Sequence, residues 1–346
     1  MLEPPKFGLM VGGEPPFATA TDCISLGVRA EKDGYDSIWV PDHLIDIDGS
    51  MADPWSTLGY LSAVTRKLLL YTSVTDYQKV HPAKLAQILA TLDELSRGRM
   101  TVGIGAGEKM NNSPFGVPWD EASVRVDKLR EYIEVMRVLW RSSHRDPVSF
   151  EGTHFRLENA WLDQKIITKP TPRVCIGAMG STLMLRLIGT HGDAWLPTLM
   201  TPDLYRKKLR VIAEAARKAG RDAGMIERVY YAYVVASEDS KVIADFTRSF
   251  KATIATLCPF IVEAEGVKLP KMKLETNFQR MVVTNEALKE LEAQAESIPD
   301  SLVRKTCAVG GADEIIDYLE EAIEAGAQHF CLAATRGQPE ENLKVL

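Results

Sequence analysis

The chain alternates short, almost wholly apolar runs with amphipathic helical patterns along most of its 346 residues. Runs such as KFGLMVG, YDSIWV and RVYYAYVVA lack the polar alternation of a half-exposed strand, which indicates strands buried on both faces of a parallel sheet. The helical patterns between them have recognisable ends: Asp53 before Pro54 begins one helix, and Gly34 ends another. The alternation therefore predicts an α/β fold with crossover connections.

Eight strands are expected, and eight βα units favour a closed (β/α)8 TIM barrel over an open doubly wound sheet. The glycine fingerprint of open dinucleotide-binding sheets, GxGxxG, does not follow the first strand. We expect one domain over residues 1–346, with a small β excursion at 144–171 and a helical insertion at 237–311 between strands seven and eight. The expected strands are 6–12, 35–40, 67–75, 99–107, 172–180, 193–198, 228–236 and 327–334.

Charge and motif content exclude several classes of protein. A formal net charge of −6 argues against a nucleic-acid partner, which would require a basic face. No apolar run is long enough for a membrane span, and the N-terminus lacks the features of a signal peptide. The five scattered cysteines indicate a reduced, cytoplasmic protein. Since HExxH, DxDxDG and Cys/His clusters are absent from the sequence, we expect no metal.

Polar residues follow the strands at the end where barrel enzymes carry their active sites. Each of them has a simpler structural explanation on its own; a carboxylate at a helix start, for example, interacts favourably with the helix dipole. One histidine and two carboxylates from three strand ends nevertheless suggest catalysis. The turn GAMGST is either an ordinary N-capped helix start or an anion site. The candidates at these ends include Glu14, Asp42, His43, Ser73, Thr75, Glu108, Asn111 and Thr198.

The glycines of GIGAGEKMN have two explanations. Gly103, Gly105 and Gly107 meet either a packing requirement at the barrel rim or a need for the backbone to approach a ligand closely. We expect the second, with Glu108 held at the rim to face a substrate.

Three segments resemble the bacterial-luciferase-like superfamily, in particular its branch that depends on the deazaflavin coenzyme F420. They are GYDSIWVPDHL, TSVT with HPAKLAQILATLDELSRGRMTVGIGAGEKMN, and AGAQHFCLAA. This branch includes F420-dependent alcohol and glucose-6-phosphate dehydrogenases and methylenetetrahydromethanopterin reductase. The resemblance implies hydride transfer between C5 of the deazaflavin and a hydroxyl or carbonyl carbon of a small organic substrate.

The resemblance also implies roles for matching residues. His43 would face the ring and handle the substrate proton, Glu108 would be the active-site acid, and Glu14 a third catalytic polar residue. Ser73–Val74 would be a non-prolyl cis peptide that supports the ring. The other implied coenzyme contacts are Asp42, Thr75, Asn111, Thr198 and the phosphate turn of Gly177, Ala178, Met179 and Gly180.

Departures from the branch leave alternatives open. Ile47 stands where dehydrogenase members carry Trp, TLMT after Thr198 lacks the Lys of the sugar-phosphate enzyme, and Met10 replaces an acidic residue of the pterin reductase. An FMN-dependent monooxygenase, a C–N reductase that uses F420 and a cofactor-free binding barrel remain possible. We also expect a homodimer formed by outer helices near strands two and three, which carry Trp55, Leu58, Leu85 and Leu92.

Overall fold

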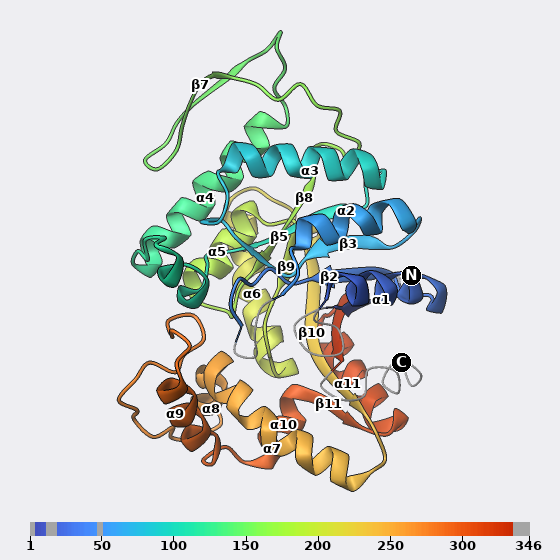
Figure 1. Ribbon diagram of the computed structural model, residues 1–346, viewed down its shortest axis with the longest axis vertical. Helices are drawn as coiled ribbons and strands as arrows, with labels where there is room; N and C mark the ends of the chain where they lie inside the picture. The colour runs from blue at the N-terminus through green and yellow to red at the C-terminus, as the bar shows by residue number, and fades with distance from the viewer. Residues whose placement is uncertain (1–3, 12–18, 47–50, 335–346) are drawn as a thin grey trace.

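Parallel strands pair side by side until the last returns to the first, which closes a barrel (Figure 1). The computed structural model describes residues 4–11, 19–46 and 51–334. The predicted (β/α)8 barrel is therefore confirmed. Its strands, in order around the barrel, are β1 (Lys6–Met10), β2 (Ser37–Val40), β3 (Leu69–Thr72), β5 (Met100–Gly105), β8 (Arg173–Gly177), β9 (Ala194–Leu196), β10 (Glu227–Ala236) and β12 (His329–Ala334).

Helices surround the barrel, and their ends follow the signals read from the sequence. The Asp53 carboxylate caps α2 by accepting a hydrogen bond of 2.7 Å from the Ser56 N–H. Gly34 ends α1 with φ 93°, a left-handed conformation that glycine adopts without steric cost. The outer helices are α1 (Ala20–Asp33), α2 (Pro54–Val64), α3 (Pro82–Ser96), α4 (Ala122–Leu139), α5 (Thr182–His191), α6 (Pro202–Lys218) and α11 (Ala312–Ala325). Among the described residues, no helix is both long and apolar enough to cross a bilayer.

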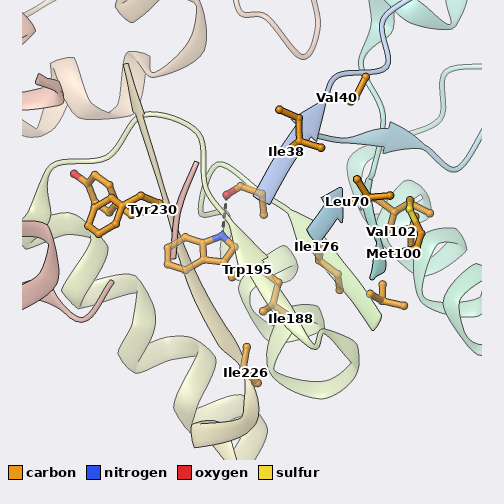
Figure 2. Packing of buried hydrophobic residues seen from close by; sticks show 14 of the residues in the cluster. Ile38, Val40, Leu70, Met100, Val102, Ile176, Ile188, Trp195, Ile226 and Tyr230 are labelled. Carbon is orange, nitrogen blue, oxygen red and sulfur yellow. Dashed lines mark hydrogen bonds between the residues drawn. The ribbon is translucent and has the colours of Figure 1, made fainter. Parts of the chain in front are cut away.

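The main hydrophobic core lies between the strands and these helices (Figure 2). Ile38 of β2, Val102 of β5 and Ile176 of β8 are fully buried in this core. Trp195 on β9 is also fully buried, and its indole N–H donates a hydrogen bond of 3.1 Å to the Ala178 carbonyl, just beyond β8. This bond connects the core to a turn at the carboxyl end of the barrel.

The opposite end of the barrel is filled by a charged network built from the first residues of several strands. Glu227, at the start of β10, pairs with Arg173 at 3.0 Å and with Nδ1 of the fully buried His329 at 3.1 Å. His329 Nε2 lies 2.7 Å from the Ser37 hydroxyl. Because these groups satisfy one another, the amino end of the barrel is closed. A ligand would therefore enter from the carboxyl end.

Two excursions interrupt the βα repeat, as expected, and lie toward opposite ends of the molecule in Figure 1. The first is an antiparallel hairpin of β6 (Val148–Glu151) and β7 (Arg156–Ala160). The second follows β10 and contains α7 (Ser240–Leu257), α8 (Pro259–Ala264), α9 (Asn285–Ala295) and α10 (Asp300–Thr306).

The insertion is helical, as predicted, but it also contains one strand that the sequence did not predict. Its last segment, β11 (Cys307–Gly310), pairs in parallel with Tyr233–Ala236 at the end of β10. β10 is ten residues long and extends beyond its barrel partner β9, which pairs only with Glu227 and Arg228. The last four residues of that strand edge need backbone partners, and β11 supplies them.

Candidate functional site

The carboxyl ends of the barrel strands open into a cavity of about 960 Å³. This volume lies at the upper end of the range typical of small-molecule and cofactor sites. Its walls come from the barrel and from the insertion after β10. The sequence-predicted residues that line it are His43, Ser73, Val74, Glu108, Gly177, Ala178, Met179 and Thr198.

His43 and Glu108 come together in this cavity, although they are 65 positions apart in the sequence. The Nδ1 atom of His43 lies 3.2 Å from Oε2 of Glu108. Asn111 stands behind both: its Nδ2 lies 2.9 Å from His43 Nδ1 and 3.1 Å from Glu108 Oε2. The side-chain oxygen of Asn111, Oδ1, accepts hydrogen bonds from the backbone N–H groups of Leu44 and Ile45. These two bonds fix the orientation of the amide, so its NH₂ group faces the histidine and the carboxylate.

The geometry gives His43 two hydrogen-bonding states. Neutral imidazole accepts at Nδ1 from Asn111, whereas imidazolium donates from Nδ1 to Glu108. Burial lowers the pKa of His43, but attraction to Glu108 and the hydrogen bond with it outweigh burial and raise the pKa to about 9. In both states Nδ1 is occupied, which leaves Nε2 as the nitrogen available to a ligand.

Glu108 does not act as a helix cap. It precedes a short 3₁₀ turn, Lys109–Asn111, and its side chain makes no capping hydrogen bond there. The simpler explanation, a carboxylate placed to stabilise a helix start, therefore does not fit its contacts.

Asp42, Thr75, Asp76 and Lys79 form a second polar cluster beside His43 and Glu108. The Asp42 carboxylate accepts a hydrogen bond of 2.5 Å from the Thr75 hydroxyl and pairs with Lys79 Nζ at 3.1 Å. Asp76, at the end of the bulge strand β4 (Thr75–Asp76), lines the cavity. Burial raises the pKa of Asp76 to about 7, against the opposing attraction of Lys79 and with added repulsion from Glu108. Asp42, Thr75 and Lys79 thus support the site from behind and do not line the cavity.

The predicted cis peptide is present at Ser73–Val74, between β3 and β4. The single strand expected over 67–75 is therefore broken into two pieces. Both residues of this bulge line the cavity.

The glycines of this region leave room for the packing of the bulge, and Gly105 and Gly107 also line the cavity. A Cβ atom on Gly103 would lie 1.9 Å from the Thr72 carbonyl oxygen. A Cβ on Gly177 would lie 2.8 and 2.9 Å from the two methyl groups of Val74, and one on Gly105 would lie 3.1 Å from one of them. Side chains at these positions would displace the bulge, so its packing requires glycine there. The close approach of Gly105 and Gly107 to a ligand stays a prediction.

The turn after β8 forms the start of α5. Ser181 caps this helix, with its hydroxyl 3.4 Å from the Met184 N–H. Lys208 of α6 reaches the turn and donates a hydrogen bond of 2.7 Å to the Gly180 carbonyl. Helix amides and a lysine thus meet beside Met179, which lines the cavity. Such a combination suits an anionic group.

Some predicted residues lie elsewhere. Asn111 is 1% exposed and is not among the residues that line the cavity, nor is Gly180. Glu14 and Ile47 lie outside the described residues. The sequence analysis missed two residues of the site. One is Lys79, which the sequence marks only by its position four residues after Thr75. The other is Phe278 of the insertion, whose ring centroid lies 6.1 Å from that of His43.

Within the described part of the chain, one group of side chains has the spacing of metal ligands: Asp127, Glu131 and His154. Glu131 already accepts hydrogen bonds from the backbone N–H groups of residues 153–155. Asp127 pairs with Arg130 at 2.8 Å. These contacts show that the group fastens the loop of the β6–β7 hairpin to α4.

Known proteins share this architecture. A solved F420-dependent secondary alcohol dehydrogenase in complex with an F420-acetone adduct superposes with a TM-score of 0.82 and 27% identity, over 99% of this chain and 96% of that chain. An F420-dependent glucose-6-phosphate dehydrogenase from Microbacterium testaceum is 32% identical over 258 residues, which cover 72% of this chain and 73% of that protein. A phthiodiolone/phenolphthiodiolone dimycocerosates ketoreductase from Mycobacterium tuberculosis is 28% identical over 327 residues, 86% and 84% of the two chains.

The match to a family extends over nearly the whole barrel. Residues 3–329, from the start of β1 into β12, match the luciferase-like monooxygenase family. The protein therefore belongs to the luciferase-like monooxygenase family.

Proposed function

We propose that this protein is a coenzyme F420-dependent oxidoreductase acting on a hydroxyl or carbonyl carbon of a small organic substrate. The observation that carries the proposal is the contact between His43 and Glu108 in a cavity that the Ser73–Val74 bulge also lines. The similar F420-dependent dehydrogenases and the ketoreductase support the same chemistry.

The residues present fit this coenzyme. The cavity of about 960 Å³ has room for a deazaflavin together with a small substrate. Ser73 and Val74 would support the ring, and the turn at Gly177–Gly180 would hold the phosphate with Lys208 beside it. Coenzyme F420, when bound, supplies a carbon that gives or takes a hydride.

The chain itself must manage one proton. When a carbonyl is reduced, its carbon gains a hydride and its oxygen gains a proton; when a hydroxyl is oxidised, both leave. His43 Nε2 is the group that carries this proton, because Nδ1 is held by Glu108 and Asn111. A pKa of about 9 keeps the imidazole charged at neutral pH, so His43 is ready to donate a proton to a carbonyl oxygen.

Two other functions make different predictions about the cofactor. A luciferase-like monooxygenase would bind FMN, and a binding barrel would bind neither compound. A reductase of methylene pterins would use F420 on a C–N bond, but the pterin reductase structure is only 20% identical and shares the fold alone.

Titration of the purified protein with F420 and with FMN, followed by fluorescence quenching, separates an F420-dependent enzyme from the FMN-dependent monooxygenase and from the binding barrel. We expect F420 to bind more tightly than FMN. Lys208→Met should weaken F420 binding at least tenfold, because a hydrogen bond between charged groups contributes about 1.5–3 kcal/mol. Lys207→Met, an exposed neighbour on α6, is the matched control. Micromolar FMN binding without detectable F420 binding would overturn the proposal in favour of the monooxygenase.

We also propose that the protein works as a homodimer in the cytoplasm. The leucines that suggested the dimer, Leu58, Leu85 and Leu92, are at most 5% exposed and belong to the core of one chain. Two other apolar side chains on the same helices are better placed: Tyr60 of α2 is 56% exposed and Leu95 of α3 is 58% exposed. The five buried free cysteines are compatible with a reducing compartment.

Sedimentation velocity tests the dimer. Leu95→Glu should shift the protein toward monomer, whereas Leu183→Glu, which changes an exposed leucine of α5, should not. A monomeric unmodified protein at micromolar concentration would refute this assembly.

A further inference from the structure

An aromatic wall leads from the centre of the cavity into the insertion. Tyr231 and Tyr233 of β10 have ring centroids 5.1 Å apart, and Tyr233 packs against Phe250 of α7 at 4.6 Å. Phe250 in turn stacks on Phe246 at 4.8 Å. At the barrel end of this run, the Tyr231 hydroxyl lies 3.2 Å from the sulfur of Met10. All five side chains line the cavity, so the wall is continuous from β1 to α7.

The insertion contributes further apolar lining. Phe278, whose ring contacts His43, belongs to the segment before α9. Leu257 ends α7, and Leu288 and Leu291 lie on α9; all of them line the cavity. A ligand bound at His43 would therefore meet apolar side chains when it extends toward α7 and α9.

The charged side chains of this region do not favour an anion. Of the described residues that line the cavity, Arg248 and Lys251 are the cations of the insertion. Lys251 pairs with Asp300 at 2.6 Å, and Arg248 with Asp245 at 3.2 Å. Two carboxylates, Glu292 and Glu296, stand at the exposed rim without an opposing excess of positive charge. Each of these two cations has a carboxylate partner, so the insertion adds no net positive charge to the cavity that would favour a phosphate group.

The phosphate turn and the insertion follow different strands of the barrel, and Met179 of the turn packs against the same hydrophobic cluster as Phe250 of the insertion. The turn at Gly177–Gly180 follows β8, whereas the insertion follows β10. A coenzyme anchored at the turn would leave the side of the cavity toward α7 and α9 for the substrate.

We infer that the substrate is a ketone or secondary alcohol with an extended apolar substituent, which lies along the aromatic wall toward α7 and α9. This inference rests on the proposed function, because the reacting carbon is placed at His43. It specifies the substrate class: lipid-like carbonyl compounds fit, and phosphorylated sugars do not. Each methylene group that such a wall removes from water should tighten binding about fourfold.

A homologous series of ketones tests the inference. Acetone, 2-hexanone and 2-decanone are compared with glucose 6-phosphate, first by the shift in melting temperature of the protein with and without F420. Turnover is then measured with reduced F420. We expect both the stabilisation and kcat/KM to rise with chain length, and glucose 6-phosphate to stabilise the protein less than 2-decanone does.

Leu288→Glu places a charge among the apolar side chains that α9 adds to the cavity. The position is partly exposed, so the fold should tolerate the change. We expect this variant to lose at least tenfold in kcat/KM for 2-decanone. Ile316→Glu, on the outer surface of α11 and 51% exposed, should leave the whole series unchanged.

The two hypotheses fail in different ways. If F420 does not bind, the proposed function fails, but the melting shifts without F420 still measure the dependence on chain length. If F420 binds and chain length has no effect, or glucose 6-phosphate stabilises the protein most, the inferred substrate class is wrong.

Discussion

Replacing Glu108 with glutamine should change the charge state of His43 at neutral pH. The amide keeps the size and shape of the side chain but removes the negative charge that lies 3.2 Å from His43 Nδ1. Burial alone lowers the pKa of His43, and Glu108 is the main group that raises it to about 9. Without that charge, burial is left as the strongest influence. The pKa of His43 should then fall below its ordinary value of 6.5.

The size of the effect follows from these values. The difference between the ordinary pKa of 6.5 and about 9 corresponds to about 3 kcal/mol of interaction that favours imidazolium in the folded protein. Because the folded pKa is the higher one, this stabilisation is fully present below pH 6.5. It is lost as the pH rises from 6.5 through 9. Glu108→Gln should remove this part of the pH dependence of stability.

Nuclear magnetic resonance of histidine-labelled protein measures the titration directly. The chain has six histidines, so comparison with His43→Gln identifies the resonance of His43. Glu292→Gln is the matched control, because this carboxylate lines the same cavity but is not among the charges that shift His43. If His43 titrates at the same pH in Glu108→Gln and in the unmodified protein, the proposed pairing is wrong.

Three further outcomes are expected. His43→Ala and Glu108→Gln should each lower turnover by about 10²–10⁴, the usual cost of losing a positioned acid or base, while F420 affinity changes far less. Gly177→Ala should destabilise the protein by about 1–3 kcal/mol in urea and weaken F420 binding, because its new methyl group would overlap the bulge. Gly59→Ala, whose methyl group has 3.8 Å of room within α2, should instead be neutral or stabilising by up to about 1 kcal/mol. Burial raises the pKa of Glu227, but the His329 hydrogen bond and the charge of Arg173 outweigh burial and lower the pKa to about 2. Folding stability in urea should therefore fall as the pH drops from 4.5 toward 2. Glu227→Gln should flatten that dependence on pH.

The barrel could be predicted from the sequence because its evidence is local. Apolar runs, the Asp53 cap and the glycine at position 34 each report on a few neighbouring residues, and the order of elements then fixes the closed sheet. β11 escaped prediction because CAVG is four residues long and its pairing depends on how far β10 extends beyond β9. Nothing within the segment itself reports that distance.

The site was predicted less completely, and for a related reason. The order of the strands places His43 and Glu108 at one end of the barrel, so their proximity follows from topology. The role of the glycines does not follow from topology, because the same glycine pattern is needed whether the space beside it holds a ligand or Val74. The contacts of Asn111 depend on the path of the loop after β2, which the sequence does not specify.

A substitution at Asn111 should shift the pKa of His43 in the opposite direction to Glu108→Gln. Its carbonyl oxygen accepts hydrogen bonds of 2.7 and 3.0 Å from the Leu44 and Ile45 N–H groups, and aspartate at this position could keep both. The second carboxylate oxygen would then replace an NH₂ group 2.9 Å from His43 Nδ1 and 3.1 Å from Glu108 Oε2. Two carboxylates at that separation repel each other, and a proton on Nδ1 between them relieves the repulsion. We therefore expect Asn111→Asp to raise the pKa of His43 above about 9, whereas Glu108→Gln lowers it. The same histidine resonance reports both changes. An unchanged or lowered pKa in Asn111→Asp would mean that the amide does not face Nδ1 and that His43 is positioned by Glu108 alone.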